Sequence, residues 1–145
     1  MQKRMLGSSG LEVTAVGFGA MTIGGCFGPV DDNESLRALH AAIDGGISFI
    51  DTSNAYGEGR SETIIGKFLS ERSGSEDIII CTKGGNSFDT FPGGGWGRDF
   101  TSVFIEKCLE ESLRRLGREA IDFYLLHNPK LDDMKAEDCY AFLEK

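Results

Sequence analysis

The chain has 145 residues, of which 40% are hydrophobic and 26% charged, as expected for a single soluble domain with its own core. Its net charge of −8 argues against nucleic acid or an anionic membrane as a partner, because both bind basic surfaces. No apolar run approaches the ~20 residues that cross a bilayer, and residues 1–13 lack the apolar stretch of a secretory signal. The four cysteines have no close pair, so we expect a reducing, cytoplasmic setting.

The N-terminal part of the chain predicts a β-hairpin followed by a helix. Residues 3–19 contain two short strands around the turn "GSSG", and the second runs on into a longer strand. Residues 31–46 predict a helix that Asp31 or Asp32 caps and that two glycines end.

The rest of the chain predicts strands and helices in alternation. In order, they are a strand at 47–51, a helix at 61–71 with Ser61 as its cap, a strand at 77–83, a long loop at 84–99, a helix at 102–117, a strand at 121–127 and a helix from 135. In the helix at 102–117, Ile105, Leu109, Leu113 and Leu116 should line the buried face. This alternation is typical of parallel βαβ units.

Ionisable residues stand at the ends of three apolar strands. Asp51 ends "ISFID", Lys83 ends "DIIICTK" and His127 ends "IDFYLLH", while Tyr56 lies in the loop after Asp51. Parallel strands bring their carboxyl ends to one rim, where ligands bind. We therefore expect these four side chains to lie together.

Such a set suits proton delivery. A tyrosine with its ordinary pKa of ~10 is a poor acid near neutrality, and a lysine ammonium beside it favours the phenolate. Asp51 would supply the counter-ion of Lys83, and His127 would either bond a substrate carbonyl oxygen or share a proton with Tyr56.

Each of the four residues also has an ordinary structural explanation. Alone, Asp51 would be a turn or capping residue, Lys83 a solvated strand end, His127 a satisfied structural histidine, and Tyr56 a loop aromatic. Their coincidence on one rim favours the functional interpretation. No serine or cysteine is placed as a nucleophile beside a base, and the four cysteines have neither disulfide-like nor metal-ligand spacing, so we expect no metal.

Four segments resemble the aldo-keto reductase family. "FIDTSNAYGEGRSETIIGKFL" (49–69) is similar to the segment around the family's catalytic Asp and Tyr, and "IICTKGG" (79–85) to the segment with its Lys. "ESLRRLGREAIDFYLLHNP" (111–129) resembles the segment with its active-site His, and "LGSSGLEVTAVGFGAMTIGG" (6–25) the N-terminal hairpin and first strand.

The resemblance implies a TIM-type (β/α)₈ barrel that reduces an aldehyde or ketone with NADPH. By motif, Tyr56 would be the proton donor, Lys83 would depress its pKa with Asp51 as ion-pair partner, and His127 would orient the carbonyl. Cofactor contact is implied for Gly19, Ala20, Met21 and Asp51. Substrate contact is expected for Trp96 and Asn128, although Trp96 could equally pack within its own loop.

A complete barrel of this type takes ~250 residues, whereas this chain predicts only four strand–helix units. We therefore expect residues 1–145 to be the N-terminal half of a barrel, truncated within the fourth helix. Open strand edges would then favour self-association. The alternative to an enzyme is a non-catalytic half barrel that acts as an assembly or interaction module.

Overall fold

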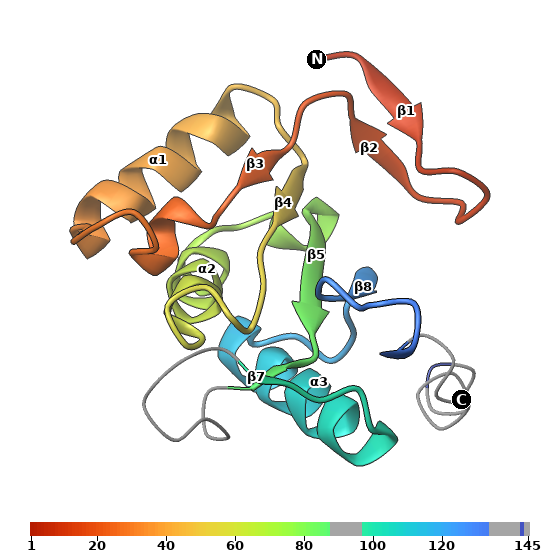
Figure 1. The fold of residues 1–145 in the computed structure, drawn as a ribbon. Coiled ribbons are helices and arrows are strands. Elements are labelled where there is room, and N and C mark those ends of the chain that lie inside the picture. The colour runs from red at the N-terminus through yellow and green to blue at the C-terminus, as the bar shows by residue number, and fades with distance from the viewer. Residues whose placement is uncertain (88–96, 134–142, 144–145) are drawn as a thin grey trace.

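The computed structural model of the chain describes residues 1–87, 97–133 and 143 (Figure 1). In chain order its elements are β1 (Lys3–Met5), β2 (Glu12–Thr14), β3 (Phe18–Gly19), the 3-10 helix η1 (Thr22–Gly24), α1 (Asp32–Asp44), β4 (Phe49–Asp51), α2 (Arg60–Glu71), the 3-10 helix η2 (Ser75–Asp77), β5 (Ile79–Gly84), β6 (Asn86–Ser87), β7 (Gly97–Arg98), α3 (Ser102–Leu116) and β8 (Phe123–Leu126). The helix predicted from residue 135 and the predicted pocket residue Trp96 lie outside the described residues.

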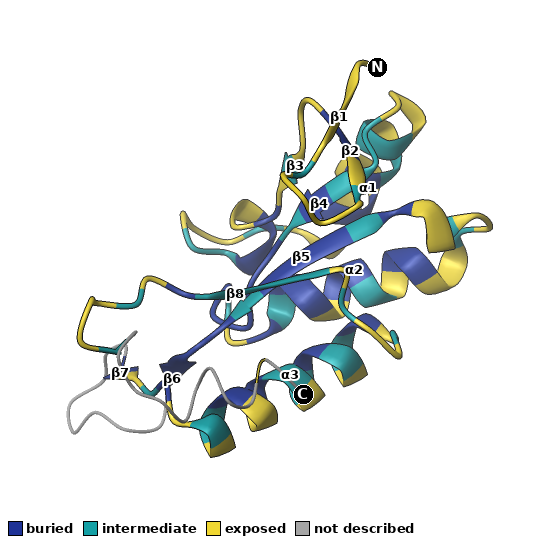
Figure 2. Cartoon of the chain, turned by 90° about the vertical axis from the view of Figure 1, so that its right-hand side faces the viewer, coloured by how far each residue is buried: buried dark blue, intermediate teal, exposed yellow. Residues whose placement is uncertain are grey.

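The central sheet is parallel, as the sequence predicts, and its strand order is β3-β4-β5-β8. The order never reverses along the chain. Because crossovers between parallel strands are right-handed, an order without reversal puts every helix on the same side of the sheet. Figure 2 shows α2 and α3 along one side of β5.

The helices cover the sheet through apolar faces that the sequence predicts in part. Leu36 and Leu39 of α1 and Ile65 and Phe68 of α2 are buried with Ile50 in one core cluster. In α3 the predicted face is confirmed at Ile105 and Leu116, whereas Cys108 and Ser112 take the buried positions expected for Leu109 and Leu113. Its buried residues are Ile105, Cys108, Ser112 and Leu116, while Leu109 and Leu113 are half-buried. Small side chains face the sheet there because β5 comes close, and a Cβ added at Gly84 would lie 3.0 Å from Cβ of Cys108.

The start of α2 also differs from the prediction. The N-cap is Gly59, at φ 89°, and Ser61 is the second residue of the helix rather than its cap. The Ser61 side chain is fully buried, and its hydroxyl donates to the backbone oxygen of Ala20 at 2.9 Å and lies 2.9 Å from the Thr52 hydroxyl. Ser61 therefore ties α2 to the segments that follow β3 and β4, because its hydroxyl faces the core and not the helix end.

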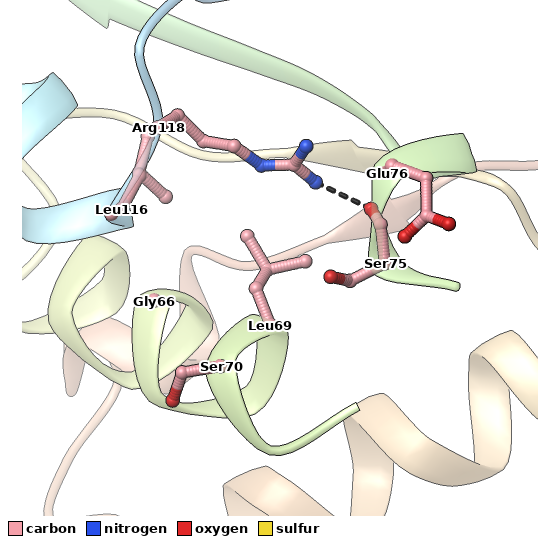
Figure 3. A pocket seen from close by; sticks show the side chains of 8 residues that line it. Gly66, Leu69, Ser70, Ser75, Glu76, Leu116 and Arg118 are labelled. Atoms are coloured by element: carbon pink, nitrogen blue, oxygen red, sulfur yellow. Dashed lines mark hydrogen bonds between the residues drawn. The ribbon is translucent and has the colours of Figure 1, made fainter. Parts of the chain in front are cut away.

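Hydrogen bonds hold together the segments near the amino ends of the strands. Thr14 of the hairpin accepts a hydrogen bond from the backbone of Ser48, just before β4. Arg118, after α3, donates to the backbone oxygen of Ser75 in η2. Figure 3 shows this bond across a hollow of about 260 Å³ between α2, η2 and the end of α3. Within the described part of the chain, no helix is both long and apolar enough to cross a membrane.

Candidate active site

The sheet brings the predicted residues to one rim. Asp51 ends β4 and pairs with Cys81 of β5. Lys83 therefore lies two positions further along β5 than the residue that pairs with Asp51. Lys83 is the penultimate residue of β5, which runs one residue further than predicted, to Gly84. His127 follows directly on β8, and its backbone N–H donates to the oxygen of Gly84 at 2.8 Å.

The Lys83 ammonium is the centre of the site. Its Nζ lies 2.7 Å from Oδ1 of Asp51, 2.7 Å from the backbone oxygen of Thr52 and 3.3 Å from the hydroxyl oxygen of Tyr56. Burial by itself would lower the pKa of Lys83, but the hydrogen bond and charge of Asp51, together with Tyr56, hold that pKa above its ordinary value. Lys83 is therefore a cation near neutrality, with Tyr56 as one of its three acceptors.

Tyr56 is fixed by backbone contacts of its loop. Its backbone amide donates to the backbone oxygen of Ser53 at 3.2 Å, and its backbone oxygen accepts from the amide of Ser61 at 3.1 Å. The next residue, Gly57, lies at φ 65°, and a Cβ there would meet the oxygen of Gly24 in η1 at 2.1 Å. The loop is thus pressed against η1, which leaves Tyr56 8% exposed.

His127 lies against Tyr56 and is held by Ser53. The two aromatic rings meet edge to face, with centroids 5.7 Å apart. Nδ1 of His127 lies 2.7 Å from Oγ of Ser53. Burial and the positive charge of Lys83 lower the pKa of His127, and the negative charge of Asp51 opposes them only in part. The imidazole is therefore neutral near pH 7.

A hollow of about 440 Å³ opens over these side chains. It is lined by Met21, Tyr56, Lys83, Asn86, Leu125, Leu126, His127 and Asn128. It therefore contains three of the four predicted reactive residues, together with the predicted contact residues Met21 and Asn128. A ligand in this hollow would meet the Tyr56 hydroxyl and the His127 ring on an otherwise largely apolar wall.

The predicted cofactor segment divides between accessible and buried residues. Gly19 and Asp51 line a second hollow, of about 500 Å³, that runs along β3 and β4 to the hairpin. Ala20, between Gly19 and Met21, is fully buried. Its backbone amide donates to the backbone oxygen of Asp51, and its backbone oxygen accepts from the Ser61 hydroxyl. Only Gly19, Met21 and Asp51 could therefore touch a ligand, and Ala20 supports them from behind.

Sequence reasoning missed the buried polar residues that hold this site. Thr52, Ser53 and Asn54 fill the space between Asp51 and Tyr56 and are almost wholly buried. Asn54 donates to the backbone oxygen of Asn86 at 3.3 Å, which joins this loop to the segment after β5. The signal in the sequence was the run "TSN" itself, because three successive small polar residues between two functional candidates need internal partners.

A second missed residue, Glu62, lies beneath the site. Its carboxylate is fully buried, accepts from the Thr82 hydroxyl at 2.6 Å and from Nε of Arg115 at 2.7 Å, and so links α2, β5 and α3. Thr82 is the neighbour of Lys83 in β5, and successive strand residues point to opposite faces. Glu62 and Arg115 therefore anchor β5 from the helix side while Lys83 faces the rim.

Other chemistries find less support on this rim. Burial and the neighbouring Asp51 raise the pKa of the Cys81 thiol to about 12, so the thiolate does not form near neutrality. Cys26, Cys81 and Cys108 are free thiols. Among the described residues there is no group of three or more His, Cys, Asp or Glu side chains arranged to hold a metal ion.

Comparisons with known proteins give matches over most of the chain. The family model described as "Aldo/keto reductase family" matches residues 15–145. "Uncharacterized oxidoreductase YqkF" of Bacillus subtilis is 38% identical over 144 residues, which are 99% of this chain and 44% of that protein. L-galactose dehydrogenase of Arabidopsis thaliana is 36% identical over 88% of this chain and 38% of its own length. The solved holo form of aldo-keto reductase AKR11C1 from Bacillus halodurans superposes with a TM-score of 0.85 and is 37% identical, over 99% of this chain and 46% of that one. The chain thus spans less than half the length of these relatives.

Proposed function

The chain belongs to the aldo/keto reductase family, and we propose that it carries the proton-donating part of a site that reduces an aldehyde or ketone to an alcohol with NADPH. Its fold comprises parallel β/α units of a TIM-type barrel and covers about half of the solved relative. The observation that carries the proposal is the Lys83 ammonium, which bonds both Asp51 and the Tyr56 hydroxyl beside the His127 ring.

The proposed roles follow from these contacts. Tyr56 gives its hydroxyl proton to the substrate oxygen as that oxygen gains negative charge. The Lys83 ammonium, 3.3 Å from the Tyr56 oxygen, stabilises the phenolate that remains. Asp51 holds the ammonium in place, and His127 binds the carbonyl oxygen. When bound, the reduced nicotinamide supplies the hydride that the carbonyl carbon accepts.

The residues at the end of β3 fit the nicotinamide end of such a cofactor. A Cβ at Gly19 would meet nothing within 4 Å, so the backbone there faces open space. Gly19, Met21 and Asp51 would hold the cofactor, with Ala20 behind them. The choice of NADPH over NADH rests on the family resemblance.

The substrate wall is proposed from the hollow. Asn128 lines it, lies at φ 55°, and accepts a hydrogen bond on its backbone oxygen from Arg98 at 3.1 Å. We propose Asn128 as a substrate contact on this ground. Trp96 stays a proposal from the sequence.

A second candidate function is assembly. β3 and β8 are the edge strands of the described sheet, and all four residues of β8 are only half-buried. Met5 and Val16, on the hairpin side, are each 57% exposed. An open edge and apolar surface favour pairing with another polypeptide, so a non-catalytic half barrel that binds a second copy or another chain is the alternative.

Replacement of Tyr56 by Phe tests the proton-donor role. Tyr56→Phe should abolish carbonyl-dependent oxidation of NADPH, a loss of roughly 10²-fold or more, while the affinity for NADPH stays within about twofold. Tyr124→Phe is the matched control, because Tyr124 lies in β8 and does not line the hollow. Normal turnover by Tyr56→Phe would disprove the assignment.

A titration of residues 1–145 with NADPH separates the two functions. The chain's single tryptophan reports binding by fluorescence quenching, and light scattering in the same buffer gives the size of the particle. Saturable binding with carbonyl reduction supports the reductase. A defined oligomer that binds no NADPH supports the assembly module.

A further inference from the structure

Ser53 joins the two sides of the candidate site. It follows β4 by two residues, its side chain is fully buried, and its Oγ lies 2.7 Å from Nδ1 of His127, which follows β8. This contact spans the sheet across β5, because β4 and β8 are both neighbours of β5 and not of each other. No other side chain among the described residues bonds the His127 ring in the structure.

The surroundings of Ser53 determine where its single hydroxyl hydrogen goes. The amide of Ala55 donates to Oγ at 3.1 Å and so occupies one lone pair. Three acceptors remain within reach, of which Nδ1 of His127 is nearest. The other two, Oδ1 of Asn54 and the backbone oxygen of Lys83, are both at 3.4 Å, which is long for an O–H···O bond. The Lys83 oxygen already accepts from the amide of Asn54 at 3.2 Å. The hydrogen therefore belongs on the bond to His127.

The imidazole has only one hydrogen to place. A buried His127 beside the Lys83 cation is neutral near pH 7, and a neutral imidazole carries its hydrogen on one nitrogen and a lone pair on the other. If Nδ1 accepts from Ser53, the hydrogen is on Nε2.

We propose that Ser53 is a positioning residue whose hydroxyl donates to Nδ1 of His127 and so keeps the ring hydrogen on Nε2, where it bonds the substrate's carbonyl oxygen. The proposal rests on the proposed function, because it takes the acceptor of this N–H to be the oxygen of a carbonyl substrate. It also distinguishes the two roles that the sequence leaves open for His127. A ring with Nε2–H and an occupied Nδ1 has no free lone pair, so it binds the carbonyl and does not take a proton from Tyr56.

Nitrogen NMR of the chain tests the position of the hydrogen directly. The chain has two histidines, so His40→Gln leaves His127 as the only imidazole and assigns its signals. A long-range ¹H–¹⁵N spectrum near neutral pH should show an imine-type shift for Nδ1 and an amine-type shift for Nε2. An amine-type Nδ1 would overturn the proposal.

Two serine variants make the test specific. In Ser53→Ala, Nδ1 loses its donor, and its ¹⁵N resonance should move away from the wild-type position. Ser61→Ala is the matched control, because Ser61 is as deeply buried and bonds Ala20 and Thr52 but not His127. Unchanged His127 resonances in Ser53→Ala would overturn the proposal. If Ser53→Ala does not fold, the wild-type shifts still decide the question.

Kinetics then distinguish this proposal from the proposed function. With an aldehyde substrate, Ser53→Ala should lower kcat by about tenfold, less than the 10²–10³ that follows complete loss of an oxyanion donor, with little change in NADPH affinity. An unaltered kcat would overturn the role of Ser53. A wild-type protein without carbonyl reduction would overturn the proposed function, and the NMR result would still report where the ring hydrogen lies.

Discussion

The Lys83 ammonium and the Asp51 carboxylate form an ion pair of 2.7 Å between neighbouring strands of the sheet. The Lys83 side chain is 13% exposed and that of Asp51 37%, so the cation is shielded more than its partner. Because Asp51 raises the pKa of Lys83, the lysine keeps its charge in the folded protein to a higher pH than in the unfolded chain. The stability that this pair contributes is present below about pH 10.5 and is lost as the pH rises through the folded-state pKa.

Replacement of Asp51 by Asn should therefore shift the alkaline limit of activity. Without the carboxylate, burial lowers the pKa of Lys83, and the ammonium that supports Tyr56 is lost at a lower pH. We expect kcat to fall by roughly tenfold or more near neutrality, within the 10²–10⁴ that general acid catalysis contributes, and the alkaline limb of the rate profile to move to lower pH.

Asp44→Asn is the control for that experiment. Asp44 is exposed at the end of α1 and pairs with Arg72 at 2.8 Å, away from the hollow. Its loss should leave the pH–rate profile unchanged and alter stability by less than about 1 kcal/mol. An Asp51→Asn profile that superposes on that of Asp44→Asn would contradict the role given to the ion pair.

Stability should decline in mild acid because of His127. Its pKa is lowered in the folded state, so the unfolded chain takes up the proton first as the pH falls below about 6.5. The free energy of unfolding should then fall, by at most about 1.4 kcal/mol per pH unit for one group. Urea unfolding at about pH 7.5 and about pH 5.5 should show a smaller loss in His127→Gln than in His40→Gln. Equal losses in the two variants would show that His127 is not the group responsible.

The candidate reactive residues stand out in the sequence because they contrast with their surroundings. Asp51, Lys83 and His127 interrupt or end apolar strands, and parallel pairing brings such positions to one rim. The alternation of elements likewise predicts parallel pairing, since parallel strands need a crossover connection between them. These signals are local in sequence, and the sheet converts them into proximity.

The supporting residues Ser61 and Glu62 could not be predicted because their partners are distant. Ser61 is a residue type that often caps helices and lies where a cap is expected, but its hydroxyl donates to the backbone oxygen of Ala20, 41 residues away. Glu62 belongs to the polar side of α2 by sequence, yet it is fully buried because Arg115, 53 residues away, supplies its counter-ion. Polar residues with long-range partners are indistinguishable from solvated ones until the fold is known.

The buried pair of Glu62 and Arg115 should be costly to break on one side only. Glu62→Leu leaves the Arg115 guanidinium, whose side chain is 14% exposed, without its buried carboxylate. We expect a loss of about 3–5 kcal/mol in the free energy of unfolding, measured by urea denaturation. Glu111→Gln removes the more exposed partner of Arg115, at 3.3 Å, and should cost less than about 1 kcal/mol.

The double variant Glu62→Leu/Arg115→Leu completes this test. With neither charge left in the interior, much of the stability lost in Glu62→Leu should return. If the double variant is less stable than Glu62→Leu by the full cost of Arg115→Leu alone, the two side chains act independently, and the pair does not link α2 to α3.

Gly57→Ala should disturb the site through the backbone and not through a reactive group. A methyl group at Gly57 would lie 2.1 Å from the oxygen of Gly24, so η1 and the Tyr56 loop must separate. Gly7→Ala is matched to it, since Gly7 has φ 57° against 65° for Gly57 but open space around its Cβ. Gly7→Ala therefore carries only the left-handed backbone cost of about 1–2 kcal/mol, whereas Gly57→Ala adds a steric clash and displaces the Tyr56 hydroxyl from Lys83. We expect Gly57→Ala to lose more stability than Gly7→Ala and to lower kcat about 10²-fold, as a shift of ~1 Å at a reacting group does. Equal stability and equal kcat in the two variants would mean that the contact between η1 and the loop does not position Tyr56.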